Sequence, residues 1–351
     1  NLRWIIGAYF LATDRIRGLP TEADVGQEYS RDFFNANTLF GFADDNDNQA
    51  SAYFGQLNYD LNESFELSLA VRYDRDEREQ MDIAPDEFSQ TAGLTRKETF
   101  SETQPKLTLR YQPAGDLNIF ATVSKGFRSG GFNQNGVGAA AANAGIAGIE
   151  DDYRKEVSTN YEIGFKRSLA DGRVKINGGA FQTDVEDQHF FQFIGAINAQ
   201  LLNNIDEVRL RGIEIHVQYQ AIQGLNLYAA YGLTDSEIEK YVVSPSHQGN
   251  DAPYVAENTL NAGFQYEVPM GDAISGLLRL DYERRGEQYW DTANSSARSA
   301  LNLVNLRMGI ESDAQNWSAI AWAQNLTDKE YNAEYVIGGI AQPAIPRTYG
   351  I

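Results

Sequence analysis

Apolar and polar residues alternate with a period of two through most of the chain. In the run from Phe65 to Asp74, every odd position is apolar or aromatic and every even position is polar or small. The same alternation recurs around residues 107–111, 161–166, 213–219, 260–266 and 278–282. This period predicts β-strands with one apolar and one polar face. About fourteen such segments of roughly ten residues each are present, the length expected of a tilted membrane-spanning strand.

Short and long connections alternate strictly between these segments. Short turns rich in Gly, Pro, Asn and Asp occur at 60–63, 112–116, 170–172, 221–224, 269–272 and 312–315. Long polar stretches occur near 14–48, 76–101, 128–157, 184–206, 236–257, 287–300 and 327–345. The pattern predicts an all-β transmembrane antiparallel barrel with short periplasmic turns and long external loops. The Ala-rich run Gly138–Ala144 has no cap, so it is predicted to be flexible loop and not helix.

Tyrosines near the strand ends support a membrane location. Their rings favour the headgroup level, although tyrosine is also a good strand residue in its own right. The residues concerned are Tyr59, Tyr73, Tyr111, Tyr219, Tyr231, Tyr266 and Tyr282. No stretch approaches the twenty or so apolar residues of a spanning helix, which excludes a helical membrane protein.

Composition excludes several functional classes. The chain has 351 residues, with 29 Lys+Arg against 49 Asp+Glu, so its net charge of −20 argues against a nucleic-acid partner. It has no Cys, which excludes disulfides, thiolate metal sites and thiol catalysis. The three His residues are too scattered to form a metal centre. No catalytic or phosphate-binding motif is present, so we expect neither an enzyme nor a resident cofactor or metal.

Several segments resemble motifs of TonB-dependent outer-membrane receptors. The segment Ser124–Asn133 carries the most distinctive resemblance, and the hairpin of Pro105–Pro113 and Leu117–Ala121 matches the one that leads into it. Further matching segments are Tyr161–Lys166, Arg211–Ile215, Asn325–Tyr331 and Pro346–Gly350. They occur in the family's order and spread over most of the chain. Each match is weak alone, and together they are strong.

The resemblance implies a barrel of about 22 strands filled by an N-terminal plug domain. Residues 1–351 are then expected to be a partial barrel domain, with the plug, the first strands, the TonB-contacting box and the final aromatic residue lying outside this chain. No signal peptide is present, and we expect the chain to be a fragment of a longer precursor.

The resemblance also implies a function. It predicts TonB-energised active import of a ferric siderophore or similar iron complex across the outer membrane of a Gram-negative bacterium. The implied partners are the TonB complex, the scarce ligand, and the lipids and lipopolysaccharide of the membrane.

Two sets of candidate site residues follow from the face of the strand on which each side chain should lie and from its position in a loop. The ligand-binding candidates are Phe127, Arg128, Phe132, Asn133, Tyr289 and Trp290. Aromatic rings could stack on a planar ligand, and Arg128 could pair with an anionic ligand, although packing and bracing of the barrel wall or plug are the more usual roles of such residues. The glycines of Gly126–Asn133 are expected to adopt unusual backbone angles. A plug-binding ion network is predicted for the inward-facing residues Arg72, Lys106, Arg110, Glu162, Lys166, Arg211 and Glu214.

Two acidic runs, Asp44–Asn48 and Glu150–Asp152, offer oxygen ligands without the spacing of a calcium loop. We expect solvated acidic loops that interact with divalent cations bridging lipopolysaccharide.

Alternative functions remain open from the residues. Within the family, the chain could import cobalamin, haem through His189, or an oligosaccharide through Tyr289-Trp290-Asp291. From other classes come a passive fourteen-stranded channel and an adhesin.

Overall fold

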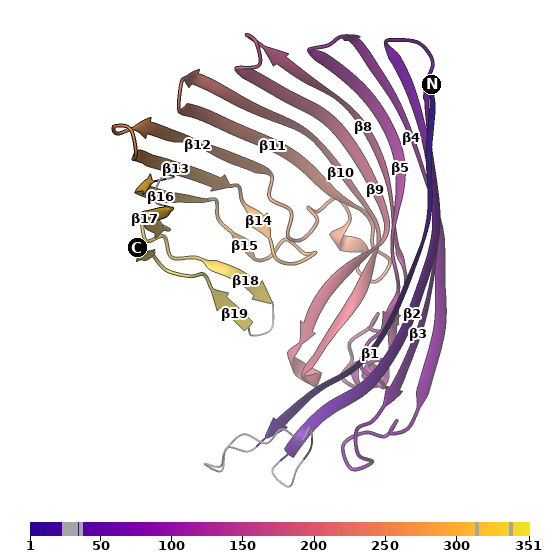
Figure 1. Ribbon diagram of the computed structural model, residues 1–351. Coiled ribbons are helices and arrows are strands. Elements are labelled where there is room, and N and C mark those ends of the chain that lie inside the picture. The colour runs from indigo at the N-terminus through magenta and orange to yellow at the C-terminus, as the bar shows by residue number, and fades with distance from the viewer. Residues whose placement is uncertain (23–33, 35–37, 313–315, 337–339) are drawn as a thin grey trace.

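The computed structural model describes residues 1–22, 34, 38–312, 316–336 and 340–351. It contains one antiparallel sheet of fourteen strands, as the alternation predicts. In spatial order the strands are β1 (Leu2–Glu22), β2 (Thr38–Asp60), β3 (Phe65–Asp82), β4 (Thr95–Ala114), β5 (Leu117–Arg128), β8 (Glu156–Leu169), β9 (Val174–Ile194), β10 (Ala199–Ile222), β11 (Leu225–Lys240), β12 (Asn258–Pro269), β13 (Ser275–Arg285), β16 (Leu301–Ser312), β17 (Trp317–Gln324) and β20 (Thr348–Gly350). The sheet curves strongly (Figure 1), and in the described residues no pairing joins β1 to β20. The barrel is therefore open.

Successive strands are hydrogen-bonded neighbours throughout the sheet, so short turns collect at one end and long connections at the other (Figure 1). In the turn between β8 and β9, residues Ala170, Asp171 and Gly172 all have positive φ, which permits a tight reversal. The predicted alternation of short and long connections is confirmed. Of the predicted turn 312–315, residues 313–315 lie outside the described part of the chain.

Many strands are longer than the predicted ten residues. β2 has 23 residues and β10 has 24, because much of the sequence predicted to be loop continues the ladder beyond the apolar belt. Arg17, for example, pairs in register with Asp44. Backbone pairing does not require apolar alternation, so the period-two signal ends before the strand does.

The two faces of the sheet differ as the alternation predicts. One face presents large exposed hydrophobic side chains, including Leu69, Val71, Ile163 and Ile213. The opposite face carries polar groups such as Arg72 and Thr108, and loop residues bond to it, as Ser129 does to Arg78. Apolar side chains that stay exposed over a whole face are expected where lipid is the neighbour. Among the described residues, no helix is long and apolar enough to cross a membrane.

Buried hydrophobic residues gather instead at the end of the sheet with the long connections. The short elements there are β6 (Gly131–Phe132), α1 (Val137–Asn143), β7 (Asp152–Tyr153), η1 (Gly195–Ile197), η2 (Pro245–His247), β14 (Gln288–Tyr289), β15 (Ala297–Arg298), β18 (Asn332–Val336) and β19 (Ile340–Pro343). Figure 1 shows the β14–β15 and β18–β19 hairpins within the curve of the sheet. We call this loop-rich end the mouth and the rest of the sheet the wall.

The prediction that Gly138–Ala144 is loop is wrong, because α1 forms there. Val137 and Ala141 are buried against Ile149, Ala199 and Leu201. The Asp151 carboxylate accepts the amides of Gly136 at 3.0 Å and Gly138 at 2.7 Å. A cap supplied from thirteen or more residues away and a buried face stabilise a helix that local sequence does not indicate.

The prediction of solvated acidic loops is also wrong for two carboxylates. Asp44 is fully buried in β2 and pairs with Arg17 at 2.8 Å. Burial raises the pKa of Asp44, and the Arg17 hydrogen bond opposes that rise. Asp151 is committed to capping α1.

Candidate functional site

The mouth contains an aromatic cavity of about 380 Å³. Five segments far apart in the sequence form it: the loop before β7, the end of the β9–β10 hairpin, the loops 241–257 and 286–300, and Val336 at the end of β18. Its aromatic lining consists of Phe190, Phe191, Phe193, Tyr241, Tyr254 and Trp290. A concave, mainly apolar site with a few polar groups is the usual form of a small-ligand site.

Trp290 is held rigidly in this lining. It is 4% exposed, and the ring of Tyr254 meets it edge-on at 5.4 Å. The neighbouring Asp291 carboxylate accepts the amides of Ala293 at 2.8 Å, Ser295 at 3.1 Å and Ser296 at 2.9 Å. This turn fixes the backbone on which the indole is mounted, so the cavity is preformed.

His247 and its neighbours connect two of the loops. The His247 Nδ1 lies 3.0 Å from the Thr292 hydroxyl, and the Asn250 amide donates to the Thr292 carbonyl at 2.9 Å. Tyr241 is almost completely buried, and burial raises the pKa of its phenol. The loops 241–257 and 286–300 therefore form one unit at the cavity wall.

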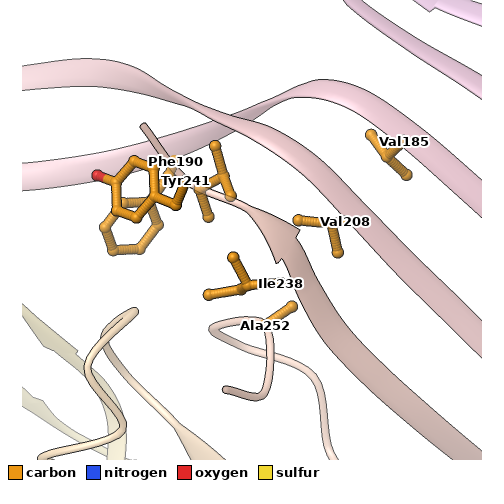
Figure 2. Close-up of a cluster of buried hydrophobic side chains, with 7 residues drawn as sticks. Val185, Phe190, Val208, Ile238, Tyr241 and Ala252 are labelled. Atoms are coloured by element: carbon orange, nitrogen blue, oxygen red, sulfur yellow. The ribbon is translucent and has the colours of Figure 1, made fainter. Parts of the chain in front are cut away.

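A hydrophobic cluster adjoins the cavity through two shared side chains. It comprises Val185, Phe190, Ile205, Val208, Ile238, Tyr241 and Ala252, and Figure 2 shows most of these side chains converging between the β9–β10 hairpin and the end of β11. Ile205 and Ile238 have no exposed surface. Because Phe190 and Tyr241 belong to both the cluster and the lining, packing in the cluster sets the shape of the cavity.

Asn133 fastens the loop 129–155 to the β9–β10 hairpin. Its amide donates to the carbonyls of Glu150 at 3.0 Å and Leu202 at 2.8 Å, and its Oδ1 accepts the Leu202 amide at 2.8 Å. Arg96 binds the other side of the same loop by donating to the carbonyls of Asn133 and Asp151. Burial lowers the pKa of Arg96. These bonds hold Ile146 and Ile149 in the cavity lining.

The glycines of the Gly126–Asn133 segment serve close packing and not unusual backbone angles. Neither Gly130 nor Gly131 has positive φ, so that prediction is wrong. A Cβ at Gly130 would lie 2.5 Å from the Phe100 ring and from the Tyr153 carbonyl oxygen. Side chains larger than hydrogen would push the loop off the sheet.

The structure separates the six predicted ligand residues. Trp290 lines the cavity, and Tyr289 precedes it in β14, where its carbonyl accepts the Tyr254 amide at 2.8 Å. Phe132 lies under the Arg96 guanidinium at 4.8 Å, and Lys155 lies 5.9 Å from the Phe127 ring. The exposed Arg128 pairs with Glu156 at 3.3 Å. Ligand contact by these residues stays a prediction, which the cavity supports for Trp290.

The predicted lumen charges lie on the polar face with one exception. Arg72 pairs with Asp74 at 2.7 Å and Arg110 with Glu66 at 2.9 Å. For Lys106, Glu162, Lys166 and Glu214, no ion pair occurs among the described residues. Arg211 has the parity of the exposed Ile213, so it lies on the apolar face, where it pairs with Asp235 at 3.0 Å. The prediction that Arg211 and Glu214 both face inward is wrong because strand neighbours three apart point to opposite faces.

His189 is occupied by a structural contact. Its Nε2 lies 2.7 Å from the Arg154 carbonyl, and its ring meets the Tyr153 ring edge-on at 5.1 Å. Burial lowers the pKa of this imidazole. Within the described residues no group of three or more His, Cys, Asp or Glu side chains gathers as a metal site.

Sequence reasoning missed most of the cavity. Phe190, Tyr241, Tyr254 and His247 come from two long polar stretches, 184–206 and 236–257, in which no period marks which side chains point inward. The one visible signal was the aromatic run at Phe190, Phe191 and Phe193.

Comparison with known proteins identifies the family. A family model described as "TonB dependent receptor-like, beta-barrel" matches residues 6–326. The chain belongs to the TonB-dependent receptor β-barrel family. This family consists of outer-membrane receptors and transporters.

Curated relatives and solved structures agree with this assignment. The metal-pseudopaline receptor of Pseudomonas aeruginosa is 25% identical over 277 residues, covering 78% of this chain and 34% of the relative. The ferrioxamine B receptor of Salmonella typhimurium is 30% identical over 138 residues, covering 37% of this chain and 19% of the relative. The ferric yersiniabactin uptake receptor of Yersinia pestis has the same fold, with a TM-score of 0.77 at 17% identity, covering 99% of this chain and 50% of that structure. The chain thus spans about a third of the first curated relative and half of the solved one.

Proposed function

We propose that this chain forms the wall and the ligand-capturing mouth of an outer-membrane receptor that imports a ferric siderophore or similar metal complex. The observation that carries the proposal is the preformed aromatic cavity at the mouth. Its placement on the side opposite the short turns corresponds to the external side of an outer-membrane barrel. The curated relatives named as siderophore and metal-complex receptors support the choice of cargo class.

The cavity residues suit capture of a complex too large to diffuse through a porin. The partly exposed rings of Phe191, Phe193 and Tyr254 offer flat apolar surface, which removes the ligand's aromatic or apolar parts from water. The buried indole of Trp290 packs against Tyr254. The His247 imidazole and the hydroxyls of Thr292 and Ser295 add a few directional polar contacts at the rim. Because the aromatic scaffold is already packed, little entropy is lost on binding.

The remainder of the receptor is part of the proposal. In the described residues the outer edge of β1, a strand of 21 residues, pairs with no other strand, and further strands would satisfy the backbone groups that point outward from it. A plug domain would fill the lumen and contact the polar face through groups such as Lys106, Glu162, Lys166 and Glu214. Energy delivered by TonB would displace that plug, since the outer membrane has no nucleotide supply. Lipids and lipopolysaccharide would contact the apolar face and the external loops.

Two alternatives are weaker on the same observations. Oligosaccharide import would use Tyr289, Trp290 and Asp291 as a platform with hydrogen bonds, but the Asp291 carboxylate is consumed by its own turn. A passive channel needs an unobstructed pore, whereas the loops here fold within the curve of the sheet (Figure 1).

The test is uptake of radiolabelled iron complexes by cells that express the full-length receptor. Trp290→Ala is expected to reduce uptake by about tenfold or more, since aromatic anchors dominate binding. Trp4→Ala is the matched control, because Trp4 is exposed on the apolar face, and uptake should be unchanged. Equal uptake by the two variants, at equal surface abundance, would reject the cavity as the capture site.

A further inference from the structure

The lining of the aromatic cavity contains an acidic side chain, Asp291, but no lysine or arginine in the described residues. Asp291 is buried, and its oxygens accept three backbone amides and the Ser295 hydroxyl at 3.2 Å. Its charge is therefore already stabilised. The lining is polar only through hydroxyls, amides and one imidazole, and it presents no formal cation to a ligand.

Arg298 lies against the lining but outside it, and its buried Nε has no hydrogen-bond partner in the described residues. It is 8% exposed and does not line the cavity, and its guanidinium lies over the Trp290 ring at 6.0 Å. Its Nη2 donates to the Gly286 carbonyl at 3.5 Å. Burial lowers its pKa, and Arg285 adds repulsion. Arg298 thus stacks on the back of the lining and is not placed to bond a ligand inside the cavity.

Acidic side chains lie on and near the loop that supplies Tyr254, outside the lining. Asp251 lies on the loop that supplies Tyr254, and its pKa is raised by burial and then by Asp235, Glu257 and Glu287. The chain as a whole has a net charge of −20. A polyanion would be repelled at long range by this net charge, and inside the cavity it would lose water without gaining a cationic partner from the lining.

We infer that the cavity takes metal complexes that are neutral or cationic overall and present apolar or aromatic surface, and that it rejects polyanionic ones. This inference rests on the proposed function and specifies its substrate class. The rejection arises from the missing cation in the lining and from the chain's net negative charge, so it depends on the charge of the complex and not on its size. A single lysine placed in the lining should therefore weaken the discrimination against polyanionic complexes.

Binding to the purified full-length receptor tests the inference directly. The probes are a neutral ferric trishydroxamate and a trianionic ferric tris(catecholate) of similar size, with affinity measured by calorimetry and by quenching of tryptophan fluorescence. The wild type is expected to bind the neutral complex at least about tenfold more tightly. Ser244→Lys adds a cation to the lining and should reduce the ratio of the two affinities, neutral over anionic, by about tenfold.

Ser246→Lys is the matched control, since Ser246 lies in the same short turn but outside the lining. This variant should leave the ratio of the two affinities unchanged. Tighter wild-type binding of the anionic complex would overturn the inference and leave the proposed function standing. An equal effect of the two lysines would also overturn it, because general surface charge would then explain the preference. Binding of neither complex would overturn the proposed function itself.

Discussion

The wall and the mouth of this molecule use apolar residues in opposite ways. In the wall, large side chains such as Leu69, Ile163 and Ile215 are exposed on one face, and the strands are joined by backbone ladders. In the mouth, apolar residues are buried in compact clusters, and side chains bond to backbone: Asn133 to that of the β9–β10 hairpin and Asp291 to that of its own turn. The wall exposes apolar side chains over one face, as expected where lipid is the neighbour, whereas the mouth buries its apolar residues as the core of a water-soluble protein does.

This difference shows where stability and specificity reside. The wall repeats the same alternation of apolar and polar side chains in strand after strand, so a wall of this kind can serve many receptors. The mouth depends on particular contacts between distant segments, and those contacts shape the aromatic cavity. Four predictions separate the two regions, from the largest expected effect to the smallest.

Removing packing from the mouth core should damage the mouth and spare the wall. Ile205→Ala deletes most of a side chain with no exposed surface and should cost about 2–5 kcal/mol in local stability. Hydrogen exchange should accelerate in the β9–β10 hairpin and not in the ladder of β3 and β4. Equal acceleration in both regions would show that mouth and wall unfold as one unit.

A charge placed on the apolar face should damage the wall and spare the mouth. Ile215→Arg puts a cation on the lipid-facing side and should cost about 2–4 kcal/mol if the position lies near the bilayer midplane. His216→Arg, one residue along and on the polar face, is the control and should be nearly neutral. Denaturant unfolding of the full-length receptor in lipid vesicles measures both. If His216→Arg proved the more harmful, the assignment of the faces would be reversed.

Loss of the Asn133 side chain should loosen one loop. Asn133→Ala removes three hydrogen bonds and strands the Leu202 amide, at a cost of about 1–3 kcal/mol. Limited proteolysis should then cut the loop 129–155 first. Asn133→Asp keeps the acceptor for Leu202 and should be intermediate. Unchanged proteolysis of both variants would contradict a fastening role.

Acid should destabilise the segment that buries His189, because burial disfavours the charged imidazole more than its hydrogen bond to the Arg154 carbonyl favours it. Because burial lowers the folded-state pKa of His189 below its ordinary 6.5, its contribution to stability is complete above 6.5 and is lost as pH falls toward the folded-state value. Proteolysis at the base of the hairpin should therefore increase modestly below about pH 6. His189→Gln should abolish this pH dependence. A pH dependence that survived the substitution would assign it to another group.

The sequence predicted the wall far better than the mouth. Alternation at Phe65–Asp74 and its counterparts marks strands because each side chain there meets one of two uniform surroundings, lipid or lumen. The same rule missed the outer halves of β2 and β10, where both faces are polar. It missed α1 because the Asp151 cap and the burial of Ala141 are tertiary features.

The cavity was predictable only in part. Trp290 was identified as a loop aromatic, but nothing local indicates that Tyr254 and Phe190 meet it across the mouth. The prediction assigned Arg211 to the wrong face, because side chains two residues apart in a strand share a face and Ile213 lies on the apolar one.

The most direct test of the central claim is to map where a bound metal complex protects the full-length receptor from hydrogen exchange. If the mouth captures the ligand and the wall only encloses it, protection should be concentrated in residues 190–194, 241–247 and 290–295. Segments of β3, β4 and β12 should exchange as in the free receptor. Protection confined to the polar face of the wall, with these three mouth segments unchanged, would contradict the account.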